Sequence, residues 1–448
     1  CLSTSTPMSS VDSAKEDFLM HFQLSHLNSF GLAELEPVIP AAWAIITYLK
    51  QLHHSDCSHI TRCSPFKDSQ FMMMDTVTVR NLELVRPLHP DQRQGSLFWV
   101  LNQTKTTLGS RLLKQWLKQP LQNQEAIDQR LDCVESLKQD LLSREEIREQ
   151  LKQVYDLERL LSRIASDYHN PRDLIALKES LQAIYDLAGI LSHCDCSRFV
   201  EMTDFFEYIN DEEHPFNTII SLITAAIEEP APPSISQVNF LKTTYDPALE
   251  ELKASFQTIK DWIGTLEAKE RQSTGIKTLK VGFNKVFGYF FQVSKGQSQS
   301  VPDHYIRKQT LTNAERYITP ELKEKETILL HGEEKQLELE QRLYKSLIKT
   351  ITNHSDLLQE CARLVAELDC YQSLASIAQQ QHYCRPTFTS QQSHLIDLTD
   401  SRHPVLAKQA SQNTISNRIF LSEDSHIMLI TGPNMAGKST LMKQVALT

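Results

Sequence analysis

Near the C-terminus the sequence reads Ile427-Met428-Leu429-Ile430-Thr431-Gly432-Pro433-Asn434-Met435-Ala436-Gly437-Lys438-Ser439-Thr440. Its first four residues form an apolar run of the length of a buried strand, and a Gly-x-x-x-x-Gly-Lys-Ser pattern follows at once. Apolar residues then recur at the spacing of a helix at Leu441, Met442, Val445 and Leu447. A strand, a glycine-bearing loop and a helix in this order predict a phosphate-binding loop.

The predicted loop supplies the groups that bind a nucleotide. Glycines let backbone N–H groups curl around phosphate oxygens, and the helix N-terminus adds a partial positive charge. Lys438 can reach the β- and γ-phosphates, and the Ser439 hydroxyl can bind Mg²⁺. We therefore predict ATP and Mg²⁺ as ligands, held by Gly432, Pro433, Asn434, Met435, Ala436, Gly437, Lys438, Ser439 and Thr440. The alternative is a Gly-Lys-Ser turn without a ligand.

Length and composition set the broad class. The chain has 448 residues, 40% hydrophobic and 23% charged, which predicts two to four ordinary globular domains. No apolar stretch is long enough to span a bilayer, and the N-terminus lacks the pattern of a signal peptide. Nine cysteines without a CxxC pair favour a reduced cytosol over a disulfide framework or a zinc site. The chain begins with Cys1 and stops eight residues after Thr440, so we expect a fragment of a longer protein.

Amphipathic helices dominate the middle of the chain. Apolar residues recur at helical spacing from Ser96 to about Leu191, from Tyr245 to Lys269, and from Pro320 to about Ala378 with a break near Asn353. Pro230-Ala231-Pro232-Pro233 is the sharpest interruption between them. No catalytic constellation lies on these helices, so we predict a helical scaffold.

Two clusters precede this scaffold. Met72-Met73-Met74 is interpreted as core filling, and Asp75 as the N-cap of a helix that begins at Thr76. The histidine-rich residues 53–59 suit either a metal site or a solvated loop, and the loop is the preferred interpretation.

Residues 271–308 differ from the rest of the chain in charge and pattern. They contain seven Lys or Arg and one acid, a net charge of +6 in a chain of net charge −10. Ile276 to Phe283 and Val286 to Val293 are rich in β-forming residues, with Gly282 to Lys285 suited to the turn between them. A basic β module between helices predicts contacts with nucleic-acid phosphates, and an ordinary solvated sheet face is the alternative. The candidate contacts are Lys280, Lys285, Arg307 and Lys308.

After Ala314 we expect the helical pattern to return, and short β-like segments follow it. The strand candidates are Leu395 to Leu398, Ile415 to Leu421 and Ile427 to Ile430, with a turn at Ser401 to Pro404. Together with the glycine-bearing loop they predict the opening of an α/β nucleotide-binding domain.

Several motifs together resemble the MutS family of DNA mismatch repair ATPases. Thr431 to Thr440, with its Pro-Asn-Met interior, looks like that family's own form of the Walker A loop. Thr78 to Leu84 resembles the start of the family's helical core, and Asp156 to Leu160 and Pro171 to Leu174 fit the inside of that core. Asn284 to Tyr289 resembles the clamp hairpin, and Gln309 to Leu322 the return from clamp to lever. Arg402-His403-Pro404 matches the entry to the ATPase domain.

The resemblance implies a mixed α and α/β multidomain protein. Its long-helix core and lever would carry an inserted β-rich clamp, followed by the start of a P-loop ATPase domain of the ABC type. The implied domains are the C-terminal part of a connector (1–62), the first part of the helical core and lever (63–238), the clamp (239–312), the returning lever helices (313–379) and the first part of the ATPase domain (380–448).

The resemblance also implies function and partners. The intact protein would be a cytoplasmic, nucleoid-associated, DNA-dependent ATPase without a membrane partner. It would bind double-stranded DNA with mismatches or small loops as a homodimer and act with a downstream factor of the MutL type. Walker B and the mismatch-reading Phe-x-Glu lie outside this chain, so we expect the fragment itself not to hydrolyse ATP efficiently.

One position departs from the family pattern, and two other functions remain open. Thr414 stands where family members commonly carry an aromatic residue near the adenine. A MutS-related paralogue that clamps branched or recombining DNA would share the same core and loop. A chromosome-organising P-loop ATPase would show long heptad repeats, which residues 320–378 do not keep.

Overall fold

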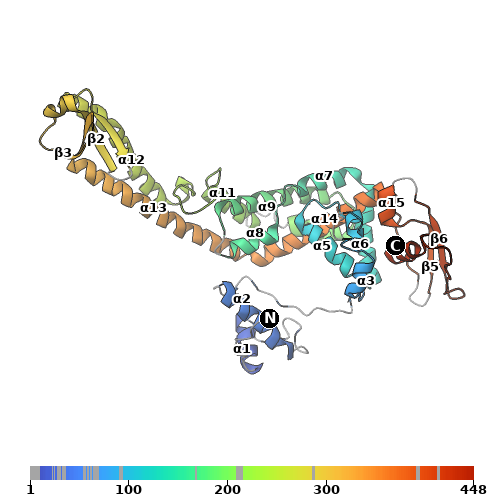
Figure 1. Cartoon of the computed structure of the whole chain (residues 1–448). Helices are drawn as coiled ribbons and strands as arrows, with labels where there is room; N and C mark the ends of the chain where they lie inside the picture. The colour runs from blue at the N-terminus through green and yellow to red at the C-terminus, as the bar shows by residue number, and fades with distance from the viewer. Residues whose placement is uncertain are drawn as a thin grey trace. The chain divides into compact units, whose positions relative to one another are not determined.

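The computed structural model describes residues 11–22, 24, 26–27, 32, 37–53, 57, 60, 63, 70–89, 94–166, 169–207, 215–284, 288–389, 394–410 and 414–448. They form two compact units. The first contains the described residues of Cys1–Tyr168, Ala176–Thr218 and His354–Thr448, and the second those of His169–Ile175 and Ile219–Asn353. Helices and small sheets make up both units (Figure 1), and no described helix has the length and apolarity of a membrane span.

Six consecutive helices of the first unit begin where the sequence provides a capping side chain. In α3 to α8, a Ser, Thr, Asn or Asp side chain just before the helix accepts a hydrogen bond from the N–H three residues later. Asp75 does so with the N–H of Thr78 at 2.6 Å, as the sequence predicts. The described helices of this unit up to residue 380 are α1 (Val11–His21), α2 (Ile39–His53), α3 (Thr76–Asn81), α4 (Leu97–Leu101), α5 (Thr107–Lys118), α6 (Gln124–Gln139), α7 (Leu141–Leu151), α8 (Leu157–Ile164), α10 (Ser197–Glu207) and α14 (Ser355–Gln380). Two further helices, α9 (Pro171–Leu191) and α11 (Pro215–Ala226), have residues in both units.

Helix α14 forms the centre of the first unit. It packs against α5, α6, α7 and α8 and buries sixteen of its residues. One of them is Asp369, which is fully buried and accepts hydrogen bonds from the N–H groups of Lys105 and Thr106 at 2.8 and 2.7 Å. The Thr106 hydroxyl and the Gln372 amide also donate to it, at 2.6 Å each. This carboxylate therefore fixes the loop between α4 and α5 against the central helix.

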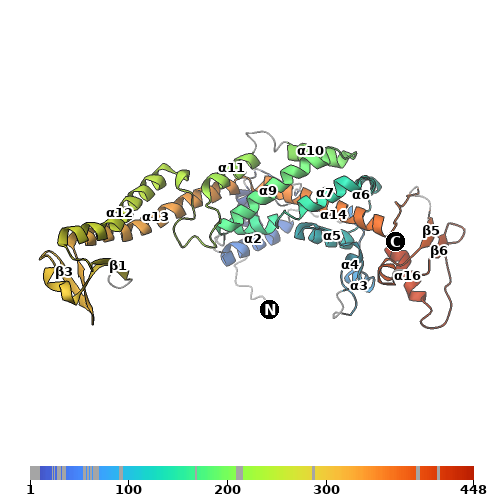
Figure 2. The same ribbon diagram turned by 90° about the horizontal axis from the view of Figure 1, so that it is seen from above.

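The second unit is built on two long helices, α12 (Pro247–Thr274) and α13 (Pro320–Thr352). They run side by side, and a four-stranded sheet lies at one end of the pair (Figures 1 and 2). Gly332 of α13 leaves room for the ring of Phe256 on α12, because a Cβ at residue 332 would overlap that ring. The predicted break near Asn353 is confirmed, since α13 ends at Thr352 and α14 begins at Ser355.

The four-stranded sheet is antiparallel and has the order β1-β2-β4-β3. One of its faces packs on the ends of α12 and α13 through a core that includes Leu266, Phe291, Tyr317 and Leu322. The strands are β1 (Lys280–Asn284), β2 (Gly288–Ser294), β3 (Ile306–Thr310) and β4 (Ala314–Ile318), and the short 3₁₀ helices η5 (Thr243–Tyr245) and η6 (Lys295–Ser300) complete the unit.

Two local predictions in this region are wrong. Gly282 to Asn284 belong to β1 rather than to a turn, because each pairs with a residue of β2. Residues 314–318 form β4 instead of resuming the helical pattern, because they pair on both sides with β2 and β3. In both places a ladder of cross-strand hydrogen bonds outweighs the local sequence preference.

The C-terminal part of the first unit contains a small antiparallel sheet and two helices. They are β5 (Ile396–Ser401), α15 (Pro404–Ala410), β6 (Asn417–Leu421) and α16 (Lys438–Leu447). The strand predicted over Ile427–Ile430 is wrong for this structure: these residues belong to no strand, and Ile427 and Leu429 are 81% and 87% exposed. A β-strand is stable only when a neighbour pairs with its backbone, and no described strand lies beside this segment.

Candidate functional site

The glycine-bearing loop leads directly into α16, as its sequence predicts. Gly432 and Gly437 have φ values of +150° and +88°, which residues other than glycine rarely adopt. A Cβ at Gly437 would meet open space, so backbone conformation rather than crowding requires glycine there. Met435 also has a positive φ, of 67°, and its side chain is fully exposed. The loop is therefore a sharply turned, accessible segment ahead of a helix.

The side chain of Lys438 crosses this loop. Its Nζ donates to the carbonyl oxygens of Gly432 and Pro433, at 2.6 Å each. Gly437 is the N-cap of α16. Because glycine has no side chain, the N-cap provides no side-chain acceptor to the first N–H groups of the helix. Ser439, the predicted Mg²⁺ ligand, is exposed. An ammonium, a hydroxyl and helix N–H groups at one accessible turn fit the phosphates of a nucleotide and their metal ion.

Buried Gln444 anchors α16 to the small sheet. The residue is 1% exposed, and its Nε2 donates to the hydroxyl of Ser401 in β5 at 2.9 Å. Its Oε1 accepts from the amide of Asn417 in β6 at 3.2 Å. A single side chain thus holds the helix behind the loop to both strands.

An ion pair connects α16 to the segment between α3 and α4. Lys443 Nζ lies 3.0 Å from Glu83 Oε2, and Glu83 also accepts the N–H of Leu88 at 2.8 Å. Burial alone would raise the pKa of Glu83, but the Leu88 N–H and the Lys443 ammonium together lower it. Burial and the nearby Lys443 lower the pKa of His403, which stays neutral more readily as a result. Sequence reasoning missed Glu83, since nothing in its surroundings in the sequence marks a contact 360 residues away.

The three described basic residues among those predicted to contact nucleic acid lie on the two opposite edges of the sheet. Lys280 is exposed on β1 and Lys308 on β3, the two opposite edges of the sheet. Arg307 forms an ion pair with Glu315 at 3.4 Å, and Lys308 occupies the irregular position where the pairing of β3 with β4 shifts. Lys285 lies outside the described residues.

A polar row does cross the whole sheet on the face opposite its core. Lys280 pairs with Gln292, Gln292 with Arg316, and Arg316 with Gln309, so these four side chains share one face. The Arg316 guanidinium donates to Gln309 at 2.9 Å and lies 4.2 Å above the ring of Phe290. The sequence analysis did not single out Arg316. Side chains alternate along a strand, so Arg316 faces away from the core because its neighbours Glu315 and Tyr317 face inward.

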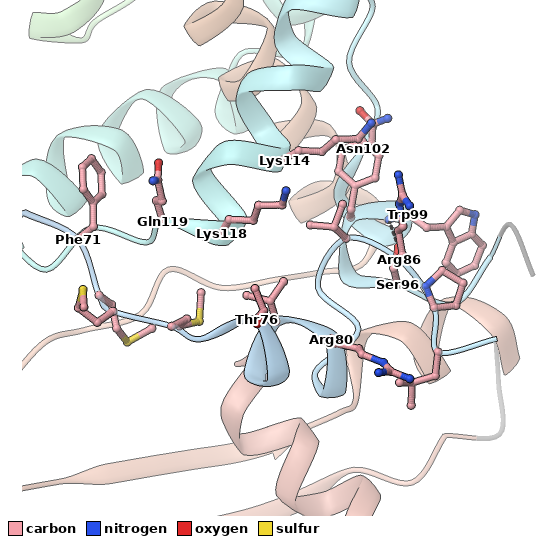
Figure 3. A pocket seen from close by; sticks show the side chains of 18 residues that line it. Phe71, Thr76, Arg80, Arg86, Ser96, Trp99, Asn102, Lys114, Lys118 and Gln119 are labelled. Atoms are coloured by element: carbon pink, nitrogen blue, oxygen red, sulfur yellow. Dashed lines mark hydrogen bonds between the residues drawn. The ribbon is translucent and has the colours of Figure 1, made fainter. Parts of the chain in front are cut away.

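A cavity of about 1250 Å³ lies elsewhere in the first unit, among α3, α4 and α5 (Figure 3). Among the described residues, four cations line it and no carboxylate does: Arg80, Arg86, Lys114 and Lys118. Met72 and Met73 also line it and are 46% and 79% exposed, so the prediction that they fill a core is wrong. Their segment pairs with the chain after α5, where Met72 N–H donates to Pro120 O at 2.8 Å, and their side chains border the cavity. No predicted site residue lies there.

Comparisons with known proteins identify relatives along nearly the whole chain. Residues 77–375 match MutS domain III. A protein of Methanosarcina mazei named DNA mismatch repair protein MutS is 39% identical over 445 residues, which cover 98% of this chain and 48% of the relative. Proteins of the same name from Geobacillus thermodenitrificans and Listeria monocytogenes are each 41% identical over 406 residues, which cover 90% of this chain and 44% and 46% of those relatives. The chain spans about half the length of these relatives.

Proposed function

Since this chain belongs to the MutS family, we propose that it forms the DNA-clamping, lever and nucleotide-binding parts of a DNA mismatch repair ATPase. The similarity of residues 77–375 to MutS domain III is the observation that carries the proposal. We assign residues 1–62 to a connector domain, 63–238 and 313–379 to the core and lever, 239–312 to the clamp and 380–448 to the start of the ATPase domain.

ATP and Mg²⁺ are the ligands that we propose for the loop before α16. Residues Gly432 to Thr440 would hold the nucleotide, with the backbone N–H groups and the Lys438 ammonium on the phosphates and the Ser439 hydroxyl on the metal ion. The positive φ of both glycines and the accessible N-terminus of α16 support this proposal. Bound Mg²⁺ would neutralise phosphate charge. The chain's own residues would position the phosphates.

Double-stranded DNA is the partner that we propose for the four-stranded sheet. The polar row formed by Lys280, Gln292, Arg316 and Gln309 supports contacts with the DNA backbone, because it combines two cations with amides on the face that the core leaves open. Phosphate contacts of this kind position a protein on a duplex without reading its bases. We propose Lys308 as a further contact, at the opposite edge from Lys280.

The intact protein is proposed to act as a homodimer in the cytoplasm, associated with the nucleoid. It would bind mismatches or small loops, hydrolyse ATP in a DNA-dependent manner and act with a factor of the MutL type. DNA and nucleotide would influence each other's affinity reciprocally, with a coupling of ~1–3 kcal/mol.

A comparison of heteroduplex and homoduplex binding tests the proposed function. For the full-length protein, we expect tighter binding to a duplex with a single mismatch than to the matched duplex, and a change in this preference when ATP is added. Fluorescence anisotropy with labelled duplexes of equal length measures both. Equal affinity for the two duplexes with and without ATP would contradict mismatch recognition and favour a clamp for other DNA structures.

Salt dependence tests the proposed DNA face of the sheet. Replacing both Lys280 and Arg316 by glutamine is expected to reduce the slope of log K against log salt concentration by about 1.8, since each lost phosphate contact contributes about 0.9. The measurement is a salt titration of binding to a matched duplex. The double variant Lys345→Gln/Lys349→Gln on α13 is the control, because these two exposed lysines remove the same charge away from the sheet. An unchanged slope in the double variant, with its circular dichroism intact, would exclude this face.

A further inference from the structure

Two cysteine side chains of the first unit are in direct contact. The Sγ atoms of Cys133 and Cys196 are 3.3 Å apart, although 63 residues separate them in sequence. Cys133 lies in α6, and Cys196 immediately precedes α10. A disulfide bond is ~2.05 Å long, so a small approach of the two sulfur atoms would join them.

The surroundings of Cys196 favour a reactive thiolate. Its carbonyl oxygen accepts the N–H groups of Phe199 and Val200 at 3.0 Å each, which places the residue at the N-cap of α10. The hydrogen bond with the Cys133 thiol lowers the pKa of Cys196 most. Burial opposes this change, and the backbone N–H groups of Arg198 and Phe199 lower the pKa further. Helix N-termini stabilise thiolates in general. Cys196 is also only partly buried, so a small oxidant has access to it.

The second sulfur has the complementary properties. Cys133 is fully buried, and its contact with Cys196 together with burial raises its pKa, so it remains a thiol. It cannot meet an oxidant first, but it already touches the atom that would be oxidised. The pair therefore combines an accessible nucleophile with a buried resolving thiol.

We propose that Cys196 and Cys133 form an oxidation site that converts to a disulfide on reaction with a hydroperoxide. The Cys196 thiolate attacks one peroxide oxygen, the O–O bond breaks, and the leaving hydroxide takes a proton to become water. The Cys133 sulfur then attacks the resulting sulfenic acid, the S–S bond forms, and the sulfenic hydroxyl leaves with the Cys133 proton as a second water. In total, two thiols and one hydrogen peroxide give one disulfide and two waters.

The disulfide would fix a junction of three helices. Next to Cys196, Arg198 forms an ion pair with Glu367 of α14 at 2.8 Å, and the ring of Phe199 lies 6.1 Å from that of Tyr371, also in α14. An S–S bond to α6 would add a covalent link where α6, α10 and α14 meet. It would close a long loop of the unfolded chain, which raises the resistance of the first unit to denaturant.

Four other described cysteines lack this combination. Cys194 is buried, and burial raises its pKa. Cys361 and Cys370 lie inside α14, and burial raises the pKa of both. Cys384 is exposed, so it serves as the control that shows whether exposure of a thiol is by itself enough for oxidation.

Peroxide treatment of this chain tests the proposal independently of DNA or ATP. After one equivalent of hydrogen peroxide, we expect a loss of two thiols, a peptide pair linked through Cys133 and Cys196 in non-reducing mass spectrometry, and a denaturation midpoint shifted to higher urea. Dithiothreitol should reverse all three changes. Oxidation of Cys384 alone, or linkage of Cys194 to Cys196, would overturn the proposal.

Three variants distinguish the two roles. Cys133→Ser, which keeps a hydrogen-bond donor beside Cys196, should leave Cys196 as a sulfenic acid that dimedone traps, whereas Cys196→Ala should abolish both the trapped species and the disulfide. Cys384→Ala should form the disulfide as the unchanged protein does. Dimedone labelling of Cys133 in the Cys196→Ala protein would contradict the assigned order. Circular dichroism of each reduced variant identifies any loss of folding, and an alanine variant that fails is replaced by the corresponding serine.

Discussion

Replacing Asp369 by alanine is expected to destabilise the helical bundle of the first unit by about 3–5 kcal/mol. The carboxylate is fully buried and accepts hydrogen bonds from two backbone N–H groups, one hydroxyl and one amide. Its removal would leave these four donors without an acceptor in a buried site. Water could take the place of the carboxylate only if the surrounding side chains repacked. Burial raises the pKa of Asp369 while the donors oppose that rise, so the site depends on four interactions with one side chain.

Urea unfolding followed by far-ultraviolet circular dichroism measures this loss. Asp369→Asn should also destabilise the protein, because its NH₂ group would face a donor where the carboxylate presents an oxygen. Gln359→Ala is the matched control: it lies on the same helix but is exposed, and we expect a change within about 0.5 kcal/mol. A loss below about 1 kcal/mol for Asp369→Ala would show that the loop between α4 and α5 is not held by this carboxylate.

Replacing Lys438 by methionine is expected to weaken the binding of ATP with Mg²⁺ to the full-length protein by about 10- to 150-fold. That range corresponds to the loss of one hydrogen bond to a charged group, about 1.5–3 kcal/mol. The structure shows the ammonium at the loop, bonded to the carbonyl oxygens of Gly432 and Pro433. Methionine keeps most of the side-chain volume and removes the charge. Isothermal titration calorimetry measures the affinity directly.

Lys443→Met is the control for this experiment. It lies on the same helix and removes the same charge, but its ammonium faces Glu83 instead of the loop. We expect its nucleotide affinity to change less than twofold and its stability by no more than about 1 kcal/mol. Equal losses in the two variants would mean that the general charge of α16 matters. Undiminished affinity in Lys438→Met would contradict a phosphate contact at this residue.

The sequence predicts helices of this chain well, because their apolar spacing and caps are local. Asp75 caps α3 as expected, and the break near Asn353 separates α13 from α14. Strand pairing is harder to predict because it depends on distant residues. The apolar run Ile427–Ile430 has the composition of a strand but no described neighbour, whereas Ala314–Ile318 becomes a strand between two others.

The same distinction applies to the candidate sites. The loop could be located from sequence because its residues are contiguous, and the helix predicted after it is present as α16. The polar row on the sheet could not, because its members come from four strands whose order differs from the order of the chain. The charge of residues 271–308 pointed to Lys280, but it grouped this residue with Arg307 and Lys308, which lie on the opposite edge of the sheet. Arg316 lies outside that range and was not predicted.

Because Gln444 anchors α16, the helix contributes little to the conformational entropy that the chain loses when a ligand binds at the loop. The second half of the helix is already fixed by hydrogen bonds to β5 and β6, whereas the loop before it is exposed. A ligand that orders the loop therefore restricts mainly Thr431 to Gly437, and each restricted residue costs about 1–2 kcal/mol at most. Substitutions that stiffen this loop without blocking it should raise affinity through a smaller entropy loss, with no new contact to the ligand.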